Sequence, residues 1–189
     1  RDHGFETEAW KVHRYVGKGG DKMVASVAGE EAESESGDAI RASEKEIYTE
    51  LIGEVRPFPD ALEFVARMNE QGQSIVLASS AKEEEVERYV DLLEVGELID
   101  GYTTSADVEA TKPEPDLVEA ALRKLGTRDA AMVGDSIWDV EAAKRAGIEC
   151  SAVLTGGFSK HELLAAGALQ VQPALADLDM RQLVRAGLT

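Results

Sequence analysis

Short apolar runs alternate with amphipathic segments from residue 72 onward. The runs suit buried strands in length and composition, and they lie at 74–78, 101–104, 130–133 and 150–154. Apolar positions elsewhere recur every three or four residues, which predicts helices over 82–93, 115–125, 137–146 and 160–166. A short strand at 169–171 and a closing helix at 179–185 complete the pattern. This alternation predicts an α/β fold, a Rossmann-like parallel sheet with helices on both faces.

The residues before Phe58 follow a different pattern. Helical periodicity covers 8–28 and 38–52 with no strand between them, and the acidic stretch 29–37 is expected to be a solvated connector. Pro57 and Pro59 then mark a stiff boundary. We therefore expect a small helical cap at 1–56 and an α/β core at 57–189, with the cap acting as a lid.

Charge and composition narrow the function classes. The formal net charge is -17, from 20 Lys and Arg against 37 Asp and Glu, and no basic stripe suits nucleic acid. No apolar stretch is long enough to span a membrane, and no signal-peptide pattern opens the chain, so we expect a cytoplasmic protein. Cys150 is the only cysteine and is expected to be a buried, inert thiol. The sequence sets no oligomeric state.

Two carboxylates follow the predicted strand at 130–133. Asp135 and Asp139 lie four residues apart, after Gly134 and at the start of a predicted helix, so they share one helix face. Such a pair at the carboxyl edge of a parallel sheet suits Mg²⁺ bridged to a phosphate. The alternative makes Asp135 a helix N-cap and Asp139 a solvated acid of the first turn.

Further residues could bind a phosphoryl group. Lys112 precedes Pro113, which keeps it out of a helix, and it could offset phosphoryl charge or simply lie in solvent. Ser79 and Ser80 end the apolar run at 74–78, where a hydroxyl could donate to phosphate. Alternatively, one of these serines caps the helix that begins near Lys82.

The glycine-rich segment 17–22 lies within the predicted helical cap. Its three glycines, Gly19 among them, free the backbone to approach a ligand, with Lys18 or Lys22 lending charge. It lacks the spacing of a nucleotide-binding loop, so a plain turn between helices is the alternative.

Taken in order, Ser79, Lys112 and the segment Gly134-Asp135-x-x-x-Asp139 resemble three signatures of the haloacid dehalogenase-like superfamily. The run from Lys112 to Asp116 and the Thr155-Gly156-Gly157 loop resemble its phosphoglycolate phosphatase-type members. The resemblance covers nearly the whole chain, with residues 8 to about 55 similar to the helical cap of that group.

The resemblance implies a Mg²⁺-dependent phosphatase that acts on a small phosphorylated metabolite through an aspartyl-phosphate intermediate. It implies that Ser79 binds the transferred phosphoryl group and that Lys112 offsets its charge. Asp135 would hold Mg²⁺, and Asp139 would orient the metal shell. Ser80, Gly19 and Lys22 remain candidate substrate contacts.

The family's Asp-x-Asp signature, which carries the nucleophile, has no match in a suitable place. The chain's one Asp-x-Asp, at 177–179, follows no buried strand. Loss of that mid-sheet strand would leave two central ladders unpaired, at a cost above the ~5–15 kcal/mol that stabilises a domain. We therefore expect an N-terminal segment outside these residues, without which the chain should be inactive. A phosphosugar mutase and a non-catalytic phosphate-binding or regulatory module remain alternatives.

Overall fold

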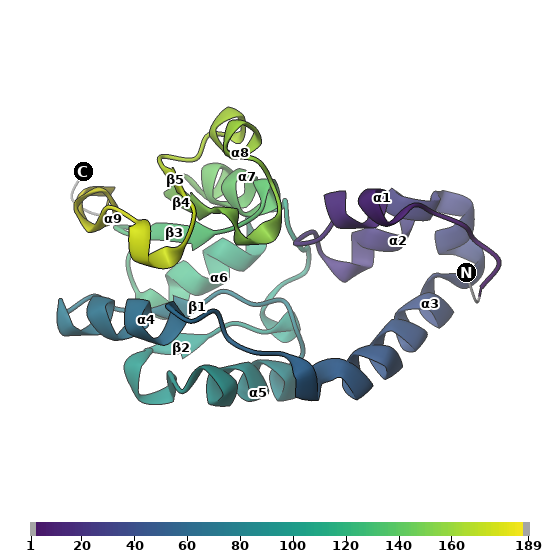
Figure 1. The fold of residues 1–189 in the computed structure, drawn as a ribbon, viewed down its shortest axis with the longest axis horizontal. Helices are drawn as coiled ribbons and strands as arrows, with labels where there is room; N and C mark the ends of the chain where they lie inside the picture. Colours follow the sequence, from purple (N-terminus) through teal and green to yellow (C-terminus); the bar gives the residue numbers. More distant parts are fainter. Residues whose placement is uncertain (1–2, 187–189) are drawn as a thin grey trace. The chain divides into compact units, whose positions relative to one another are not determined.

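The computed structural model describes residues 3–186 of the chain, which divides into two compact units, Arg1–Arg56 and Pro57–Thr189. Each unit is described by itself (Figure 1). Within residues 3–186, no helix combines the length and the apolar character needed to cross a bilayer.

The first unit is helical. It contains α1 (Ala9–Arg14), α2 (Gly20–Ala28), α3 (Glu30–Leu51) and the 3₁₀ turn η1 (Ile52–Glu54). The predicted helix at 8–28 is divided, because residues 15–19 form a turn in which Gly17 has a φ of 88°. The glycine-rich segment is thus, in part, the turn between two helices that the sequence left as one alternative.

The expected acidic connector at 29–37 is wrong, because α3 runs through it as a single 22-residue helix. Glutamate is a good helix former, and Glu30, Glu31 and Glu33 in the first turn complement the helix dipole. The Arg41 guanidinium lies 2.9 Å from Glu33 and 2.8 Å from Asp38, which offsets part of the local repulsion. Propensity and ion pairing therefore outweigh the acidity that suggested a solvated loop.

The second unit alternates strands and helices (Figure 1). Its strands are β1 (Val76–Leu77), β2 (Gly101–Tyr102), β3 (Ala131–Gly134), β4 (Glu149–Val153) and β5 (Val171–Gln172). Its helices are α4 (Ala61–Glu70), α5 (Glu83–Leu93), α6 (Asp116–Leu125), α7 (Ile137–Ala146), α8 (Lys160–Ala166) and α9 (Met180–Ala186). Short 3₁₀ turns are η2 (Gly96–Leu98), η3 (Ser105–Asp107), η4 (Leu154–Gly156) and η5 (Leu175–Asp177). Helix α4 was not among the predicted helices, although its apolar residues Ala61, Phe64, Val65 and Met68 have helical spacing.

The strands are parallel, as predicted, but they form two half-sheets instead of one sheet. β1 pairs with β2, and β3, β4 and β5 pair in that order. No strand within residues 3–186 joins β1 to β3. The division is the one expected of a parallel sheet without its middle strand.

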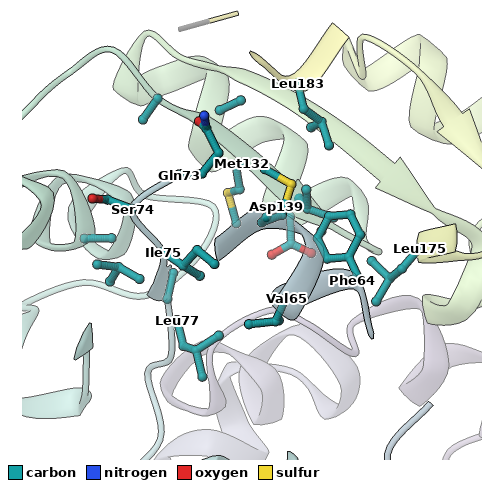
Figure 2. A pocket seen from close by; sticks show the side chains of 18 of the residues that line it. Phe64, Val65, Gln73, Ser74, Ile75, Leu77, Met132, Asp139, Leu175 and Leu183 are labelled. Carbon is teal, nitrogen blue, oxygen red and sulfur yellow. The ribbon is translucent and has the colours of Figure 1, made fainter. Parts of the chain in front are cut away.

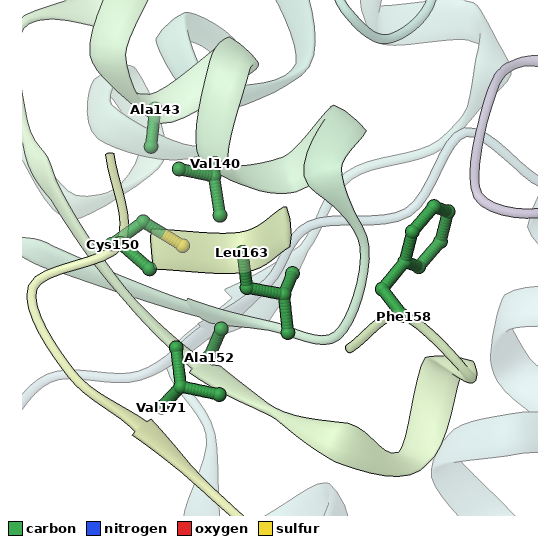
Figure 3. Packing of buried hydrophobic residues seen from close by; sticks show 8 residues of the cluster. Val140, Ala143, Cys150, Ala152, Phe158, Leu163 and Val171 are labelled. Atoms are coloured by element: carbon green, nitrogen blue, oxygen red, sulfur yellow. The ribbon is translucent and has the colours of Figure 1, made fainter. Parts of the chain in front are cut away.

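Helices cover both faces of the larger half-sheet, as predicted. One face packs Cys150 and Ala152 of β4 against Val140 and Leu163 of α7 and α8 (Figure 3). Side chains that alternate with these, from Val133 of β3 and Val153 of β4, belong to a second cluster with residues of α4, η5 and α9. Cys150 is buried as expected, and burial raises the pKa of its thiol to about 12.

Candidate active site

A buried ion pair lies just beyond the carboxyl end of β3. The Lys112 ammonium donates to Oδ1 of Asp139 at 2.7 Å, and only 17% of the lysine side chain and 7% of the aspartate side chain are exposed. The residues are 27 positions apart, so the fold brings together two groups that no local spacing in the sequence relates. An ion pair with so short a distance and so little solvent exposure holds both charges in fixed positions.

The second oxygen of Asp139 is also fully engaged. Oδ2 accepts hydrogen bonds from the backbone N–H groups of Asp135 and Ser136 and from the Ser136 hydroxyl, at 3.2, 3.0 and 2.7 Å. Ser136, not Asp135, is the N-cap of α7, and with Asp139 it forms a capping box. Both parts of the alternative interpretation are therefore wrong, since Asp135 is not the cap and Asp139 is not solvated.

Burial raises the pKa of Asp139, but the charge of Lys112 and the hydrogen bonds from Lys112 and Ser136 outweigh burial and hold that pKa below its usual value. Asp139 is thus a permanent anion at neutral pH. Both oxygens of Asp139 already accept hydrogen bonds, from Lys112 and from the turn before α7. This geometry suits a residue that positions its neighbours better than one that binds a metal ion directly. The predicted metal role of Asp139 stays untested.

Asp135 occupies a different environment. Its Oδ2 accepts a hydrogen bond from the Thr155 hydroxyl at 2.9 Å. Burial raises the pKa of Asp135; the Thr155 hydrogen bond and Lys112 oppose this rise, whereas the charge of Asp139 adds to it. Asp135 is therefore the acid of this pair that most gains from a nearby cation.

Two glycines, Gly134 and Gly156, allow the backbone to lie close to Asp139 and Asp135. A Cβ at Gly134 would lie 2.5 Å from Cβ of Asp139, and a Cβ at Gly156 would collide with the backbone carbonyl oxygen of Asp135. Neither glycine has a positive φ, so both positions require glycine for close approach and not for backbone conformation. This explains why a glycine precedes Asp135, which the sequence showed without a reason.

The oxygen ligands that this site offers meet the requirements of Mg²⁺ only in part. Mg²⁺ favours carboxylate oxygens, keeps several waters and takes further oxygens from phosphate, so Asp135 is a suitable single ligand. Among residues 3–186, no group of three or more His, Cys, Asp or Glu side chains is placed to hold a metal ion. A metal held here would need oxygen ligands from substrate, water or another carboxylate.

Ser79 lies at the end of β1, and a buried threonine fixes its backbone. The Ser79 N–H donates to Oγ1 of Thr103 at 2.9 Å, and the Thr103 hydroxyl donates to the Ser79 carbonyl oxygen at 2.8 Å. The Ser79 Oγ accepts from the N–H of Ala81. The N-cap of α5 is Lys82 without a side-chain cap, so the capping role suggested for a serine is wrong.

The hydrogen bonds given for Ser79 join it to Thr103 and Ala81 and not to the Lys112–Asp139 pair, and the predicted phosphoryl contacts of Ser79 and Ser80 stay predictions. Ala78, next to Ser79, lines the same cavity as Lys112 and Asp135. Gly19 and Lys22 lie in the first unit, at the start of α2, so their predicted substrate contacts stay predictions.

Three residues that support the site had no predicted role: Ser136, Thr155 and Thr103. Ser136 could have been found, since Ser-x-x-Asp before an apolar helix is a capping-box pattern. The other two support their partners across 20 and 24 residues, a distance at which no local spacing rule applies.

The acidic site borders a cavity of about 790 Å³ within the second unit. Lys112, Asp135 and Asp139 are among the residues that line it. Figure 2 shows apolar side chains that line the same cavity, among them Phe64, Ile75, Leu77 and Met132.

Comparisons with known proteins agree with this architecture. A hydrolase from Pseudomonas syringae superposes with a TM-score of 0.85 and 28% identity, covering 95% of this chain and 84% of that one. CbbY from Rhodobacter sphaeroides, solved with xylulose-(1,5)bisphosphate, superposes with a TM-score of 0.73 and 22% identity, covering 93% of this chain and 82% of that one. The second likeness shows the fold alone.

Sequence relatives point the same way. Pyrophosphatase PpaX of Halalkalibacterium halodurans is 30% identical over 101 residues, which cover 52% of this chain and 47% of that protein. A haloacid dehalogenase-like hydrolase domain-containing protein of Arabidopsis thaliana is 27% identical over 154 residues, covering 77% of this chain and 48% of that protein. The chain thus spans about half the length of these relatives. The family model described as haloacid dehalogenase-like hydrolase matches residues 3–153, and the chain belongs to that family.

Proposed function

We propose that this chain belongs to a Mg²⁺-dependent phosphohydrolase that acts on a small phosphorylated metabolite. The observation that carries the proposal is the buried Lys112–Asp139 pair beside Asp135 at the carboxyl end of β3. Family membership supports hydrolysis, and the acidic surface argues against nucleic acid as a substrate.

In this proposal Asp135 holds Mg²⁺, with its carboxylate oriented by Thr155. The metal supplies charge neutralisation and polarisation of the phosphoryl group. Lys112, fixed by Asp139, places a second positive charge on the same side of the site. The aspartyl-phosphate route implied by the resemblance also needs a nucleophilic carboxylate, a role that none of these residues takes in the proposal.

The family and the net charge of the chain support a small phosphorylated substrate. PpaX relatives are named as pyrophosphatases, and we include pyrophosphate among the candidate substrates. An anionic substrate must approach against a net charge of -17, so local cations must hold it. Ser79, Ser80 and Lys112 are the candidate contacts in the second unit, and Gly19 and Lys22 are those in the first.

The test measures phosphate release from pyrophosphate, sugar phosphates and p-nitrophenyl phosphate, with Mg²⁺ and with EDTA. It uses the complete product of the gene as well as residues 1–189. We expect turnover that needs Mg²⁺ and falls about 100-fold or more in Asp135→Asn. Asp91→Asn, an exposed change on α5, is the matched control and should alter turnover by less than about twofold. Turnover that persists in EDTA would contradict the proposal.

The same assay separates the rival functions. A phosphosugar mutase converts one sugar phosphate into its isomer without releasing phosphate, which product analysis detects. A non-catalytic module would bind phosphate through Lys112 but turn over none of the substrates, even as the complete gene product.

A further inference from the structure

The segment 79–81 leaves the strand ladder where β1 ends. β1 and β2 pair as far as Leu77, whose carbonyl oxygen accepts a hydrogen bond from the Thr103 N–H at 2.9 Å. In a regular parallel ladder the Ser79 N–H would donate next, to the carbonyl oxygen of Thr103. It donates instead to the Thr103 hydroxyl, at 2.9 Å. A side chain therefore replaces the backbone partner at the point where the ladder stops.

The departure from the ladder adds two residues on the β1 side. After the Thr103 N–H, a regular ladder would bring the N–H of Ser105 to the Ser79 carbonyl oxygen. The Ser105 N–H donates instead to the carbonyl oxygen of Ala81, two residues farther along, at 2.8 Å. The Ser79 carbonyl oxygen accepts from the Thr103 hydroxyl at 2.8 Å. Extra residues in a ladder change the direction of the side chains that they carry.

The Thr103 hydroxyl thus satisfies both polar backbone groups of one residue, because it accepts from the Ser79 N–H and donates to the Ser79 C=O. Thr103 is fully buried, with 0% of its surface exposed. Backbone groups in such surroundings are costly to leave without a partner, so the hydroxyl restricts where the Ser79 backbone can lie. Threonine is also stiff about its first side-chain bond, which helps to fix that hydroxyl.

The same arrangement determines which atom of Ser79 can meet a ligand. Thr103 occupies its N–H and its C=O, and the Ser79 Oγ accepts a hydrogen bond from the Ala81 N–H at 3.1 Å. A hydroxyl that accepts in this way keeps its own proton, which can donate to an anionic oxygen. The hydroxyl of Ser79 is therefore a donor on a backbone that is held from inside the second unit.

We propose that Thr103 positions the Ser79 hydroxyl to donate to a phosphoryl oxygen, and that it acts through the Ser79 backbone without touching the substrate. This inference rests on the proposed function, because it requires a phosphoryl group that binds beside Ser79. Thr103 is thus a positioning residue. Its hydroxyl should affect phosphate binding only while Ser79 carries a hydroxyl of its own.

Thr104 provides a matched comparison on the same strand end. It is 7% exposed, its hydroxyl accepts from the Ala106 N–H at 3.3 Å, and with Asp107 it forms the capping box of η3. Among the described residues its hydroxyl bonds lie within this turn and not with Ser79. Removal of either threonine hydroxyl therefore breaks buried hydrogen bonds after β2, but only the change at Thr103 releases Ser79.

The test measures the affinity of the complete gene product for inorganic phosphate in Mg²⁺, by isothermal titration calorimetry. Thr103→Val keeps the side-chain shape but removes the hydroxyl, and the affinity should fall about tenfold or more. Thr103→Ser keeps the hydroxyl and should stay within about threefold of the unchanged protein. Thr104→Val leaves the bonds to Ser79 intact and should also change the affinity by less than about threefold.

A double-mutant cycle with Ser79→Ala separates positioning from a general loosening of the fold. Ser79→Ala alone should weaken phosphate binding about tenfold or more. Adding Thr103→Val to Ser79→Ala should weaken binding by less than about threefold further, because the hydroxyl that Thr103 positions is already absent.

Amide hydrogen exchange, followed by NMR, tests the same contact without a ligand. The Ser79 N–H should exchange faster in Thr103→Val than in Thr103→Ser, since only the serine variant keeps its hydrogen-bond acceptor. Circular dichroism checks that each variant folds. If Thr103→Val does not fold, Thr103→Cys takes its place, because a thiol is a weaker donor and acceptor than a hydroxyl.

Several results would each overturn the inference: equal phosphate affinity in Thr103→Val and Thr103→Ser, additive losses in the cycle, an equal loss in Thr104→Val, unchanged exchange at Ser79, or no phosphate binding by the unchanged protein. The phosphate-release assay decides the proposed function separately. Turnover that persists in EDTA would contradict the metal chemistry, and the cycle would still decide the role of Thr103. Mg²⁺-dependent turnover with additive losses would reject the role of Thr103 alone.

Discussion

At the scale of single residues, Asp139 connects the turn before α7 to Lys112 from a distant loop. One of its oxygens accepts a hydrogen bond from the lysine, and the other accepts hydrogen bonds from Ser136 and from the N–H of Asp135. The group that orients the candidate site therefore also caps the helix, and a change there affects stability and chemistry together.

Asp139→Asn tests this double role. The variant leaves the Lys112 ammonium largely buried without its counter-charge, so the free energy of unfolding should fall by about 3 kcal/mol. Urea unfolding of the metal-free protein at pH 7 measures the loss. Glu119→Gln, which removes the exposed ion pair with Arg128, is the control and should cost less than about 1 kcal/mol.

The difference in unfolding free energy between the unchanged protein and Asp139→Asn should depend on pH, and the direction of this dependence follows from the pKa of Asp139. The pKa of Asp139 in the folded protein lies below its ordinary value, so its stabilising effect is fully present above the ordinary pKa. The effect is lost as the pH falls through the folded-state pKa. The difference between the two proteins should therefore shrink below about pH 4. A difference that stays constant down to pH 3 would contradict the assignment of the ion pair.

Thr155 supports the second carboxylate, and Thr155→Val tests its role. The variant keeps the side-chain shape but removes the hydroxyl that donates to Asp135, so Mg²⁺ or Mn²⁺ affinity should fall about 10- to 100-fold. Isothermal titration calorimetry measures the affinity without any substrate. Thr155→Ser keeps a hydroxyl donor and should retain most of the metal affinity. Equal losses in both variants would assign Thr155 to packing alone.

At the scale of elements, strands and helices after residue 72 followed from sequence because each carries a local pattern. Helix α7 begins at Ile137 and ends at Ala146 as predicted, since a capping box opens it and Gly147 closes it in a left-handed conformation. Strand ends were less accurate. β1 covers Val76–Leu77 where a longer strand was expected, because its extent depends on pairing with β2 alone.

Long-range contacts set the limit of sequence analysis at the candidate site. The Gly134-Asp135 pair and Lys112 could be chosen from sequence, because strand-end position and neighbouring proline are local signals. Their pairing through Asp139, the support from Thr155 and the close approach at Gly156 depend on how β4 and its following turn lie beside β3. Local spacing contains no information on that arrangement.

The helix that replaced the expected acidic connector gives a prediction of its own. Ser34 is exposed near the middle of the stretch expected to be loop. Ser34→Pro would be tolerated in a loop, but inside α3 it removes a backbone donor and should cost about 3 kcal/mol or more. Helical circular dichroism and thermal unfolding measure the effect. Ser34→Ala should be neutral or slightly stabilising. Equal behaviour of the two variants would mean that residues 29–37 form a solvated connector and not part of α3.

At the scale of the whole molecule, a large negative net charge opposes the folded state. The chain has a net charge of -17 in 189 residues, with a sequence pI near 4.5. Like charges on a compact surface repel one another, and this repulsion falls when the chain expands on unfolding. The division of the sheet adds open strand edges to the same molecule. Stability should therefore depend on ionic conditions more than it does for a protein of balanced charge.

Added salt tests this dependence. Raising NaCl from about 10 to 200 mM shortens the Debye length from about 30 Å to under 10 Å, which screens repulsion between distant carboxylates. The Lys112–Asp139 pair is buried and screened much less, so the net effect of salt should be stabilising. We expect the thermal midpoint at pH 7 to rise by several degrees, measured by circular dichroism in EDTA. Sucrose at matched osmolality, which screens no charge, is the control for general solvent exclusion. A midpoint that falls as NaCl rises would mean that favourable ion pairs, not net repulsion, dominate the electrostatics of this chain.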